Sequence, residues 1–264
     1  MKIAFTTLGC RLNQYESDSL ITQFKKNGYR IVKFSEIADA YIINTCTVTN
    51  KSDYKSRNAI NRAINKNPEA LIVVTGCYAD TDPKDIENIE GVDLIIDNAK
   101  KHSIVDSVMS LLTGKNIKSA KKDYFNFPAP VDGEHTRSYL KIQDGCDNYC
   151  AYCKIPYARG NPKSRTKEET LNVFKTLITS GIKEIVLTGI NIGKYSGGIA
   201  PLLKDLIKIE GKFRIHLSSI EMNFVSNELL ELFKNDKTCI HLHVPLQSGS
   251  NKTLKLMNRN YTTE

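Results

Sequence analysis

The sequence predicts an α/β fold in two parts, a doubly wound parallel-sheet domain followed by an incomplete (β/α) barrel. In both halves of the 264-residue chain, short apolar runs alternate with amphipathic helical segments, a pattern typical of parallel sheets. Between the halves lies a stretch without periodicity that contains a lysine run, two prolines and two glycines. We therefore expect domains at residues 1–113 and 136–264, joined by a linker at 114–135.

In the N-terminal half, four apolar runs predict strands at 3–7, 41–44, 71–75 and 94–96. A helical segment at 13–27 follows the first run and places Leu20, Ile21 and Phe24 on one face. It ends at Gly28, a residue suited to the left-handed conformation just past a helix. Strands and helices in this order predict a doubly wound parallel sheet.

The C-terminal half repeats this alternation, with strands predicted at 138–143, 184–188, 213–217 and 240–244. Thr166 and Glu169 form a capping box that opens a helix at 171–180, and Gly181 closes it. Repeated strand–helix units fit a (β/α) barrel, whose active sites lie at the C-terminal ends of the strands. Since only four strands precede the end of the chain, we expect an incomplete barrel.

The composition indicates which kind of binding partner and which cellular compartment to expect. A formal net charge of +8 and a pI near 9.0 favour a polyanionic partner such as nucleic acid, although charge alone is weak evidence. No stretch approaches the roughly 18 apolar residues of a membrane span, so we expect a cytoplasmic protein without a membrane partner. Seven cysteines without a secretory signal favour metal-binding or catalytic thiolates over disulfides.

Three cysteines lie in a C-x3-C-x2-C loop directly after a predicted strand: Cys146, Cys150 and Cys153. A 4Fe-4S cluster has one ligand for each iron, so three thiolates leave one iron open to a substrate chelate. The amino and carboxylate groups of S-adenosylmethionine would bind at that position. The alternative is a zinc knuckle that recruits His135 as a fourth ligand.

Three further cysteines each lie just beyond the C-terminal end of a predicted strand: Cys10, Cys46 and Cys77. The ends of parallel strands converge on one crevice, so these residues are expected to meet and form a second three-thiolate site. The alternative is three unrelated buried cysteines. Cys239 has no comparable partners and is expected to be a core thiol, with His241 and His243 packed in the barrel interior.

Several motifs in order carry a family resemblance: GCRLNQYES, NTC, TGCY, GCDNYCAYCKIPYARG, LTGINIGKY, RIHLSSIE and HVPLQSGS. Together they resemble the radical S-adenosylmethionine methylthiotransferases across essentially the whole chain. The chain is most similar to the MtaB type, which acts on N6-threonylcarbamoyladenosine beside the tRNA anticodon. The alternatives are the isopentenyladenosine and ribosomal-protein aspartate enzymes, which differ at the position of Arg11 after the first cysteine.

The resemblance implies two 4Fe-4S clusters and S-adenosyl-L-methionine as cofactors. The cluster at Cys146, Cys150 and Cys153 would generate the 5′-deoxyadenosyl radical, and the other would carry the sulfur that is inserted. The implied partners are the tRNA anticodon loop and an electron donor such as flavodoxin or ferredoxin. Members of the family continue into further barrel strands and a TRAM domain that this chain lacks. A non-catalytic iron–sulfur RNA-binding fragment is therefore the rival interpretation.

Further site residues are expected at the barrel mouth and after the cysteine loop. The predicted S-adenosylmethionine contacts lie beside the cysteines or at strand ends: Tyr152, Thr188, Gly189, Ser218 and Gln247. The predicted contacts to tRNA phosphates or to the threonylcarbamoyl carboxylate follow the loop: Arg159, Lys163 and Arg165. Tyr149 and Tyr157 are candidates for stacking on a base. Strand-end capping and an ordinary solvated loop are the alternatives for these residues.

Overall fold

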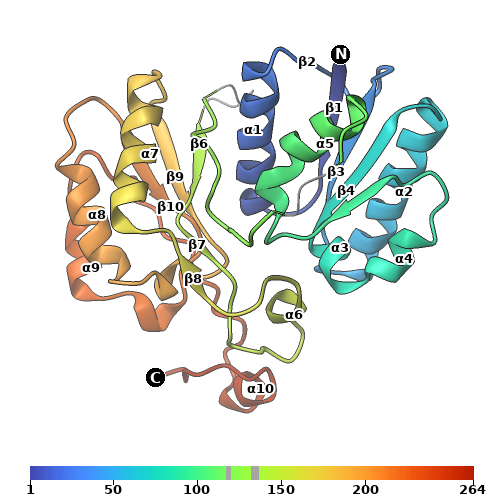
Figure 1. The fold of residues 1–264 in the computed structure, drawn as a ribbon. Helices are drawn as coiled ribbons and strands as arrows, with labels where there is room; N and C mark the ends of the chain where they lie inside the picture. The colour runs from blue at the N-terminus through green and yellow to red at the C-terminus, as the bar shows by residue number, and fades with distance from the viewer. Residues whose placement is uncertain (117–119, 132–136) are drawn as a thin grey trace. The chain divides into compact units, whose positions relative to one another are not determined.

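The computed structural model describes residues 1–116, 120–131 and 137–264 and divides the chain into two compact units. Unit 1 comprises Met1–Gly133 and unit 2 comprises Glu134–Glu264. Figure 1 shows the helices and strands of each unit.

Unit 1 is built on a five-stranded parallel sheet in the order β2-β1-β3-β4-β5. The strands are β1 (Lys2–Thr7), β2 (Arg30–Val32), β3 (Ala40–Thr45), β4 (Leu71–Gly76) and β5 (Leu94–Ile96). The predicted strands are confirmed, and β2 is an additional edge strand of three residues that the sequence did not reveal. In this order the direction of chain progression reverses between β1 and β3, where doubly wound sheets bind their ligands.

Helices cover both faces of this sheet (Figure 1). The helical segments of unit 1 are α1 (Arg11–Lys26), α2 (Asn50–Lys66), α3 (Cys77–Thr81), α4 (Pro83–Glu87), η1 (Lys101–Ser103) and α5 (Ile104–Leu112). Ile60 and Ala63 of α2 pack with Tyr41 and Ile43 of β3 in a buried apolar cluster. Gly28 follows α1 with a φ of +80°, as predicted for a residue that ends a helix.

Part of the predicted linker packs on unit 1. Phe127 is 4% exposed, and its ring lies edge-on to that of Tyr15 with 6.2 Å between centroids. The hydroxyl of Ser19 donates a hydrogen bond to the carbonyl of Pro128 at 2.9 Å. Residues 117–119 of the linker, and 132–136 with His135, lie outside the described residues.

Unit 2 contains a parallel sheet in the order β10-β9-β6 and a two-stranded antiparallel ribbon, β7-β8. The strands are β6 (Ser138–Lys141), β7 (Gln143–Asp144), β8 (Lys163–Ser164), β9 (Glu184–Thr188) and β10 (Arg214–Leu217). The helical segments are α6 (Ile155–Arg159), α7 (Lys167–Thr179), η2 (Ile192–Lys194), α8 (Ile199–Ile207), η3 (Met222–Phe224), α9 (Asn227–Leu232) and α10 (Asn251–Leu256). The predicted capping box of Thr166 and Glu169 is present at the start of α7.

One predicted strand is wrong, because residues 240–244 form no regular strand. The chain does run beside β10 just before this segment. Ile215 of β10 accepts a hydrogen bond from the amide of Cys239 at 2.9 Å and donates one to the carbonyl of Lys237 at 2.7 Å. In the described part of the chain no strand flanks the far side of this segment, and Ile240 is 89% exposed. The backbone hydrogen bonds to β10 end at Cys239, so the apolar alternation of residues 240–244 does not extend the sheet.

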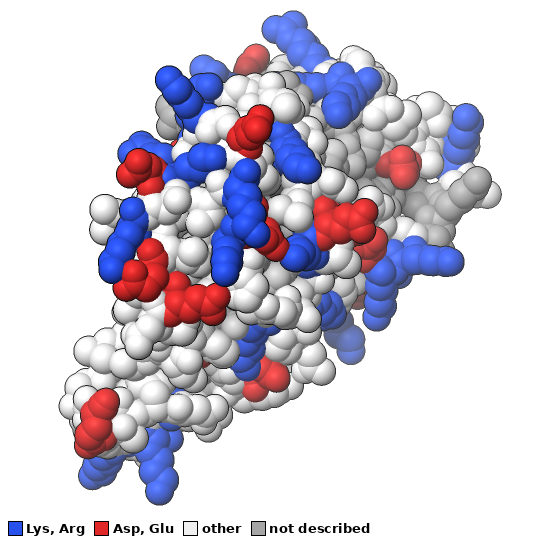
Figure 2. Space-filling model, turned by 90° about the vertical axis from the view of Figure 1, so that its left-hand side faces the viewer, with Lys and Arg blue, Asp and Glu red and all other residues white. Residues whose placement is uncertain are grey.

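Within the described residues, none of the helices is both long enough and apolar enough to cross a bilayer. On the face of unit 2 formed by α7, α8 and α9, Lys and Arg are interspersed with Asp and Glu (Figure 2). Asp205, for example, pairs with Lys167 at 2.7 Å and with Lys208 at 2.9 Å. The net positive charge of the chain is therefore not gathered on this face.

Candidate functional site: two cysteine trios

In unit 1, three cysteines follow three neighbouring strands of the sheet. Cys10 precedes α1 after β1, Cys46 comes directly after β3, and Cys77 comes directly after β4. Because β1, β3 and β4 are adjacent and parallel, their carboxyl ends lie at one edge of the sheet. Cys46 and Cys77 are buried and Cys10 is exposed. The predicted convergence at the strand ends fits this topology.

Two glycines allow the backbone around these cysteines to approach closely. A Cβ at Gly76 would lie 2.3 Å from the carbonyl oxygen of Thr45, and Gly76 has a φ of +101°. A Cβ at Gly9 would lie 2.8 Å from the Sγ atom of Cys46. Since real Cβ atoms do not approach other atoms so closely, only glycine fits at either position. Each glycine directly precedes a cysteine of the trio and brings it toward the end of β3.

Amide and ionic contacts fix the same edge of the sheet. The Asn13 side chain donates hydrogen bonds to the carbonyls of Leu8 at 2.8 Å and Thr45 at 2.9 Å, which ties the loop after β1 to the end of β3. Beneath it, the Lys101 ammonium lies 2.5 Å from Glu16 and 3.1 Å from the Oδ1 atom of Asn44, and all three side chains are buried. This network holds the ends of β1 and β3 in a fixed geometry.

In unit 2, the loop that carries Cys146, Cys150 and Cys153 has a constrained backbone. The amide of Cys146 donates to the carbonyl of Gly160 at 2.9 Å, and that of Cys153 donates to Cys150 at 2.9 Å. Tyr149 between them has a φ of +46°, which is unusual for a residue with a side chain and is typical of functional loops. Burial raises the pKa of both the Cys146 and Cys153 thiols above the ordinary value.

A buried ionic triad anchors the start of this loop. Asp144 lies 2.6 Å from the Lys141 ammonium and 2.9 Å from the Arg159 guanidinium, and the side chains of all three are fully buried. Its Oδ1 atom also accepts a hydrogen bond from the amide of Gly145 at 2.8 Å. Since Asp144 precedes the loop and Arg159 follows it, the triad joins the two ends of the loop.

The segment after α10 holds the loop from another side. The Asn258 side chain donates to the carbonyls of Asn148 at 2.9 Å and Tyr149 at 3.1 Å. The guanidinium of Arg259 lies 3.2 Å from the Sγ atom of Cys150 and 3.0 Å from a carboxylate oxygen of Glu221. These contacts place a cation directly beside one of the three sulfurs.

A polar pocket of about 190 Å³ adjoins the loop. Its lining includes the acidic Glu221 and the basic Arg259 and Lys194, together with Asn148. The Glu221 carboxylate accepts two hydrogen bonds of 2.9 Å from Asn148, and Lys194 pairs with Asp147 of the loop. Charges of both signs next to three thiols suit a zwitterionic ligand such as an amino acid.

The predicted S-adenosylmethionine contacts fall into two groups. Thr188 and Ser218 are buried at the ends of β9 and β10, and Gly189 is packed so closely that a Cβ there would lie 2.9 Å from Gln143. Tyr152 is 50% exposed within the loop, and Gln247 is exposed with a φ of +64°. Their role stays a prediction.

Two buried groups at these strand ends lack partners within the described structure. They are the hydroxyl of Ser218 and both side-chain atoms of Asn191, which is 4% exposed. Buried polar atoms are nearly always hydrogen-bonded, so such atoms mark a place where a ligand or water is expected. Cys146, Cys150 and Cys153 of the same unit offer thiol donors, so unit 2 fits a cluster together with a bound cofactor.

The structure does not favour Arg159 and Arg165 as contacts for tRNA phosphates. Arg159 is 2% exposed and belongs to the ionic triad, while the Nε atom of the 3% exposed Arg165 donates to the Lys141 carbonyl at 3.0 Å. A buried guanidinium held in this way supports the loop and is not presented to an RNA backbone. The Lys163 ammonium, which is partly exposed, donates to the carbonyl of Asn161 at 2.9 Å.

Other residues singled out in the sequence have mixed outcomes. Tyr149 and Tyr157 are 50% and 74% exposed, with their rings edge-on at 6.0 Å, so both present aromatic surface to solvent. His241 and His243 are exposed, which contradicts the expected packing in a barrel interior. Their segment lies outside any strand, so no sheet buries them. Cys239 is only partly buried, not a core thiol.

Both trios offer the donor chemistry of an iron–sulfur cluster. In the described residues, the set of His, Cys, Asp and Glu side chains close enough to share one ion is a different one, Glu184, His216 and Cys239. A cubane places each thiolate on a separate iron, so its ligands do not converge on one point. Separated thiols at strand ends and along a loop are compatible with that arrangement.

Sequence reasoning missed several residues that the structure brings to the loop. Glu221 and Asn191 lie inside the quoted motifs LSSIE and LTGINIGKY, but their side chains received no role. Arg259 lies more than a hundred positions from Cys150 and outside the motifs used, so no local pattern could have linked the two.

Comparisons with known proteins divide the chain in a similar way. Residues 2–97 match the family described as "Uncharacterized protein family UPF0004", and residues 140–264 match the Radical SAM superfamily. The second match implies a 4Fe-4S cluster and S-adenosylmethionine. By structure, the chain is similar to the radical S-adenosylmethionine methyltransferase TsrM from Kitasatospora setae, with a TM-score of 0.66 over 99% of this chain and 63% of that one. Their sequences are 12% identical, so this likeness concerns the fold alone.

Curated relatives are much closer in sequence. The chain is 44% identical to the threonylcarbamoyladenosine tRNA methylthiotransferase MtaB of Bacillus subtilis over 99% of its own length and 61% of the relative. It is 41% identical to the MtaB of Aquifex aeolicus over 100% of this chain and 67% of that protein. A tRNA-2-methylthio-N(6)-dimethylallyladenosine synthase of Thermodesulfovibrio yellowstonii is 33% identical over 98% of this chain and 62% of that protein. The chain belongs to the radical S-adenosylmethionine methylthiotransferase family and is MtaB-like.

Proposed function

We propose that this chain is the N-terminal and central part of a tRNA methylthiotransferase acting on N6-threonylcarbamoyladenosine beside the anticodon. The methylthio group is added at C2 of the adenine. The observation that carries the proposal is the three-cysteine loop of unit 2 beside a pocket lined with both charges, in a chain related to MtaB proteins. The chain spans about 60 to 67% of the length of the relatives described above.

In this proposal Cys146, Cys150 and Cys153 hold a 4Fe-4S cluster. When bound, the cluster supplies an electron that cleaves the sulfonium of S-adenosylmethionine reductively. Glu221 and Arg259 orient the amino acid part of that cofactor, since its ammonium and carboxylate need partners of opposite charge. Asn191 and Ser218 supply hydrogen-bonding groups to its remainder, because their buried atoms need partners. Thr188, Gly189, Tyr152 and Gln247 remain candidates at the rim.

A second cluster is proposed at Cys10, Cys46 and Cys77 of unit 1. Three thiolates again leave one iron without a protein ligand, and that position suits an exogenous sulfur atom. The placement of the three cysteines at neighbouring strand ends supports this proposal. We also propose that residues 1–113 and 136–264 act as separate functional domains, in keeping with the family matches at 2–97 and 140–264.

The proposed partners are tRNA and a small cytoplasmic electron donor such as flavodoxin or ferredoxin. Tyr149 and Tyr157 present exposed rings on which an unpaired anticodon-loop base can stack. Lys163, which is partly exposed, is the basic residue retained from the predicted phosphate contacts. The buried Arg159 and Arg165 act in this proposal by supporting the cysteine loop.

The test uses the full-length protein in its own cell. Deletion of the gene is expected to abolish 2-methylthio-N6-threonylcarbamoyladenosine in digested tRNA, measured by mass spectrometry, and the unaltered gene restores it. A gene carrying Cys146→Ala is expected not to restore it. Retention of that nucleoside in the deletion strain, with loss of another methylthio product, would overturn the substrate assignment.

A second measurement separates an enzyme from a non-catalytic iron–sulfur RNA-binding protein. Anaerobically reconstituted and reduced full-length protein is expected to release 5′-deoxyadenosine from S-adenosylmethionine. A protein that contains iron and sulfide but releases none would support the non-catalytic role.

A further inference from the structure

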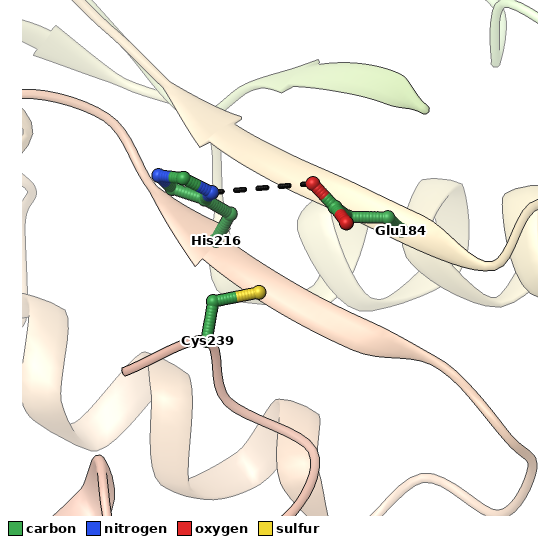
Figure 3. A group of neighbouring side chains, drawn as sticks. All are labelled: Glu184, His216 and Cys239. Carbon is green, nitrogen blue, oxygen red and sulfur yellow. Dashed lines mark ion pairs between the residues drawn. The ribbon is translucent and has the colours of Figure 1, made fainter. Parts of the chain in front are cut away.

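Three potential metal ligands lie side by side on the sheet of unit 2, apart from both cysteine trios. They are Glu184 at the start of β9, His216 in β10 and Cys239 in the segment that follows α9 (Figure 3). One ligand atom from each lies within 4.8 Å of the other two. All three residues are partly buried, so the atoms are neither deep in the core nor at the outermost surface.

The strand register explains why these side chains meet. Glu184 pairs with Arg214 in the parallel sheet, so both point to the same face, and His216 two residues later shares that face. Ile215 points to the opposite face, is 1% exposed and bridges Thr238, which places Cys239 on the His216 side. The three ligands therefore project from three neighbouring chain segments toward one point. The backbone register, and not a flexible loop, sets this arrangement.

The donor set suits a borderline-soft divalent cation. Thiolate, imidazole and carboxylate are the three ligand types that bind Zn²⁺ in proteins, and hard cations such as Mg²⁺ avoid the first. His241, two residues after Cys239, lies nearby, with 4.9 Å between its ring centroid and that of His216. His241 is thus a candidate fourth ligand beside His216, outside the group of three whose ligand atoms lie within 4.8 Å of one another.

We propose that Glu184, His216 and Cys239 form a zinc site, which His241 completes. The Oε1 atom of Glu184 faces the Nδ1 atom of His216 at 4.0 Å, a separation that a shared ion can bridge. The site lies at the start of β9, whereas Thr188 ends that strand four residues later, roughly 13 Å away at the usual rise per residue. It is therefore separate from the group of strand-end residues proposed to bind S-adenosylmethionine.

Two arginines compete with a cation for Glu184. Arg137 lies 3.5 Å from its Oε1 atom and Arg214 lies 3.3 Å from its Oε2 atom. Their side chains are 48% and 65% exposed, so solvent screens both charges. Oε2 can keep its contact to Arg214 while Oε1 turns to the ion.

The test measures zinc and iron together in anaerobically reconstituted protein that has been desalted after incubation with Zn²⁺. We expect about one zinc per chain in addition to iron, and an at least tenfold lower zinc content in Cys239→Ser and in His216→Asn. His243→Asn is the matched control, because His243 is an exposed histidine of the same segment whose ring contacts Ser219. It is expected to keep its zinc.

Cobalt binding provides a second measurement, which tests whether the Cys239 sulfur is a ligand of the metal. The difference spectrum between unaltered protein and Cys239→Ser after Co²⁺ addition is expected to show a thiolate-to-cobalt charge-transfer band, with the cluster absorption cancelled. Unchanged zinc in both variants, or zinc that is lost in Cys146→Ser instead, would overturn the proposal. Iron content is recorded separately, so failure here leaves the proposed methylthiotransferase function unaffected.

Discussion

The two cysteine trios are built in different ways. In unit 1 each sulfur comes from the end of a different strand, and the order of the sheet brings together residues from Cys10 to Cys77. In unit 2 all three sulfurs come from one loop of eight residues between Cys146 and Cys153. The first arrangement depends on the fold of the whole unit. The second depends on the conformation of a short irregular segment.

This difference determines which residues support each trio. A strand end is already fixed by the sheet, so in unit 1 the critical feature is close backbone approach at Gly9 and Gly76. An irregular loop has no such frame, and in unit 2 contacts from outside hold it. Asp144 joins its two ends through buried ion pairs, and Arg259 contacts it from a segment distant in sequence. Substitutions should therefore damage the two sites through different mechanisms.

The largest effect is expected from Asp144→Asn. It removes the carboxylate that lies against the buried Lys141 ammonium and Arg159 guanidinium. Removing one partner from a buried ion pair costs about 3–5 kcal/mol of folding free energy. Urea denaturation of the metal-free chain should show this loss, with faster hydrogen exchange in peptides from residues 145–160.

A matched control removes a carboxylate from a surface ion pair. Glu231 and Lys234 lie 2.7 Å apart, but their side chains are 67% and 73% exposed. Glu231→Gln is expected to change stability by no more than about 0.5 kcal/mol. Equal effects of the two substitutions would show that the buried triad does not anchor the loop.

Gly76→Ala is expected to have the next largest effect, in unit 1. The added Cβ meets the Thr45 backbone at 2.3 Å, and the positive φ of +101° is unfavourable for alanine. Strain and overpacking together should cost about 2–4 kcal/mol. The iron that we propose unit 1 to hold should fall, while the iron proposed for the cysteine loop of unit 2 stays unchanged.

Gly28→Ala separates the cost of backbone strain from the cost of overpacking. Gly28 also has a positive φ, of +80°, but nothing lies within 4 Å of the added Cβ. Its cost should be about 1 kcal/mol, from backbone strain alone. Iron analysis of each variant, in a chain whose unit 2 cysteines are replaced by alanine, isolates the effect on unit 1. Unchanged iron in Gly76→Ala would contradict the role of close packing at this glycine.

Regular periodicity allowed most of the fold to be predicted. Buried strands such as β3 and β4 are continuous apolar runs, and Thr166 with Glu169 marks the start of α7. The two errors both concern short segments at the edge of a sheet. β2 is too short to show a pattern, and residues 240–244 show the pattern without forming a strand. A local sequence does not reveal how many neighbours a strand will have.

The cysteines of the candidate sites could be predicted because their chemistry is visible in spacing and position. The side chains around them could not, because long-range contacts determine their burial. The sequence around Arg159 looks like a basic loop exposed to solvent. In the structure, however, the carboxylate of Asp144 holds the Arg159 side chain in the interior. Cys239 and His216 likewise meet only because of strand register.

Arg259→Gln is expected to have the smallest effect, a shift in the midpoint potential of the cluster proposed for unit 2. The Arg259 guanidinium lies 3.2 Å from the Sγ atom of Cys150, and hydrogen bonds and positive charge near a ligand sulfur favour the reduced cluster. Its loss should make the midpoint potential more negative by on the order of 50 mV, since about 59 mV corresponds to a tenfold change for one electron. Potentiometric titration followed by electron paramagnetic resonance measures this shift.

Lys255→Gln is the control, because it removes an exposed positive charge from α10 and should leave the potential unchanged. If both variants retain iron and show the same potential, the contact between Arg259 and Cys150 does not tune the proposed cluster. Arg259 then keeps its ion pair with Glu221 and its proposed contact with the amino acid part of S-adenosylmethionine.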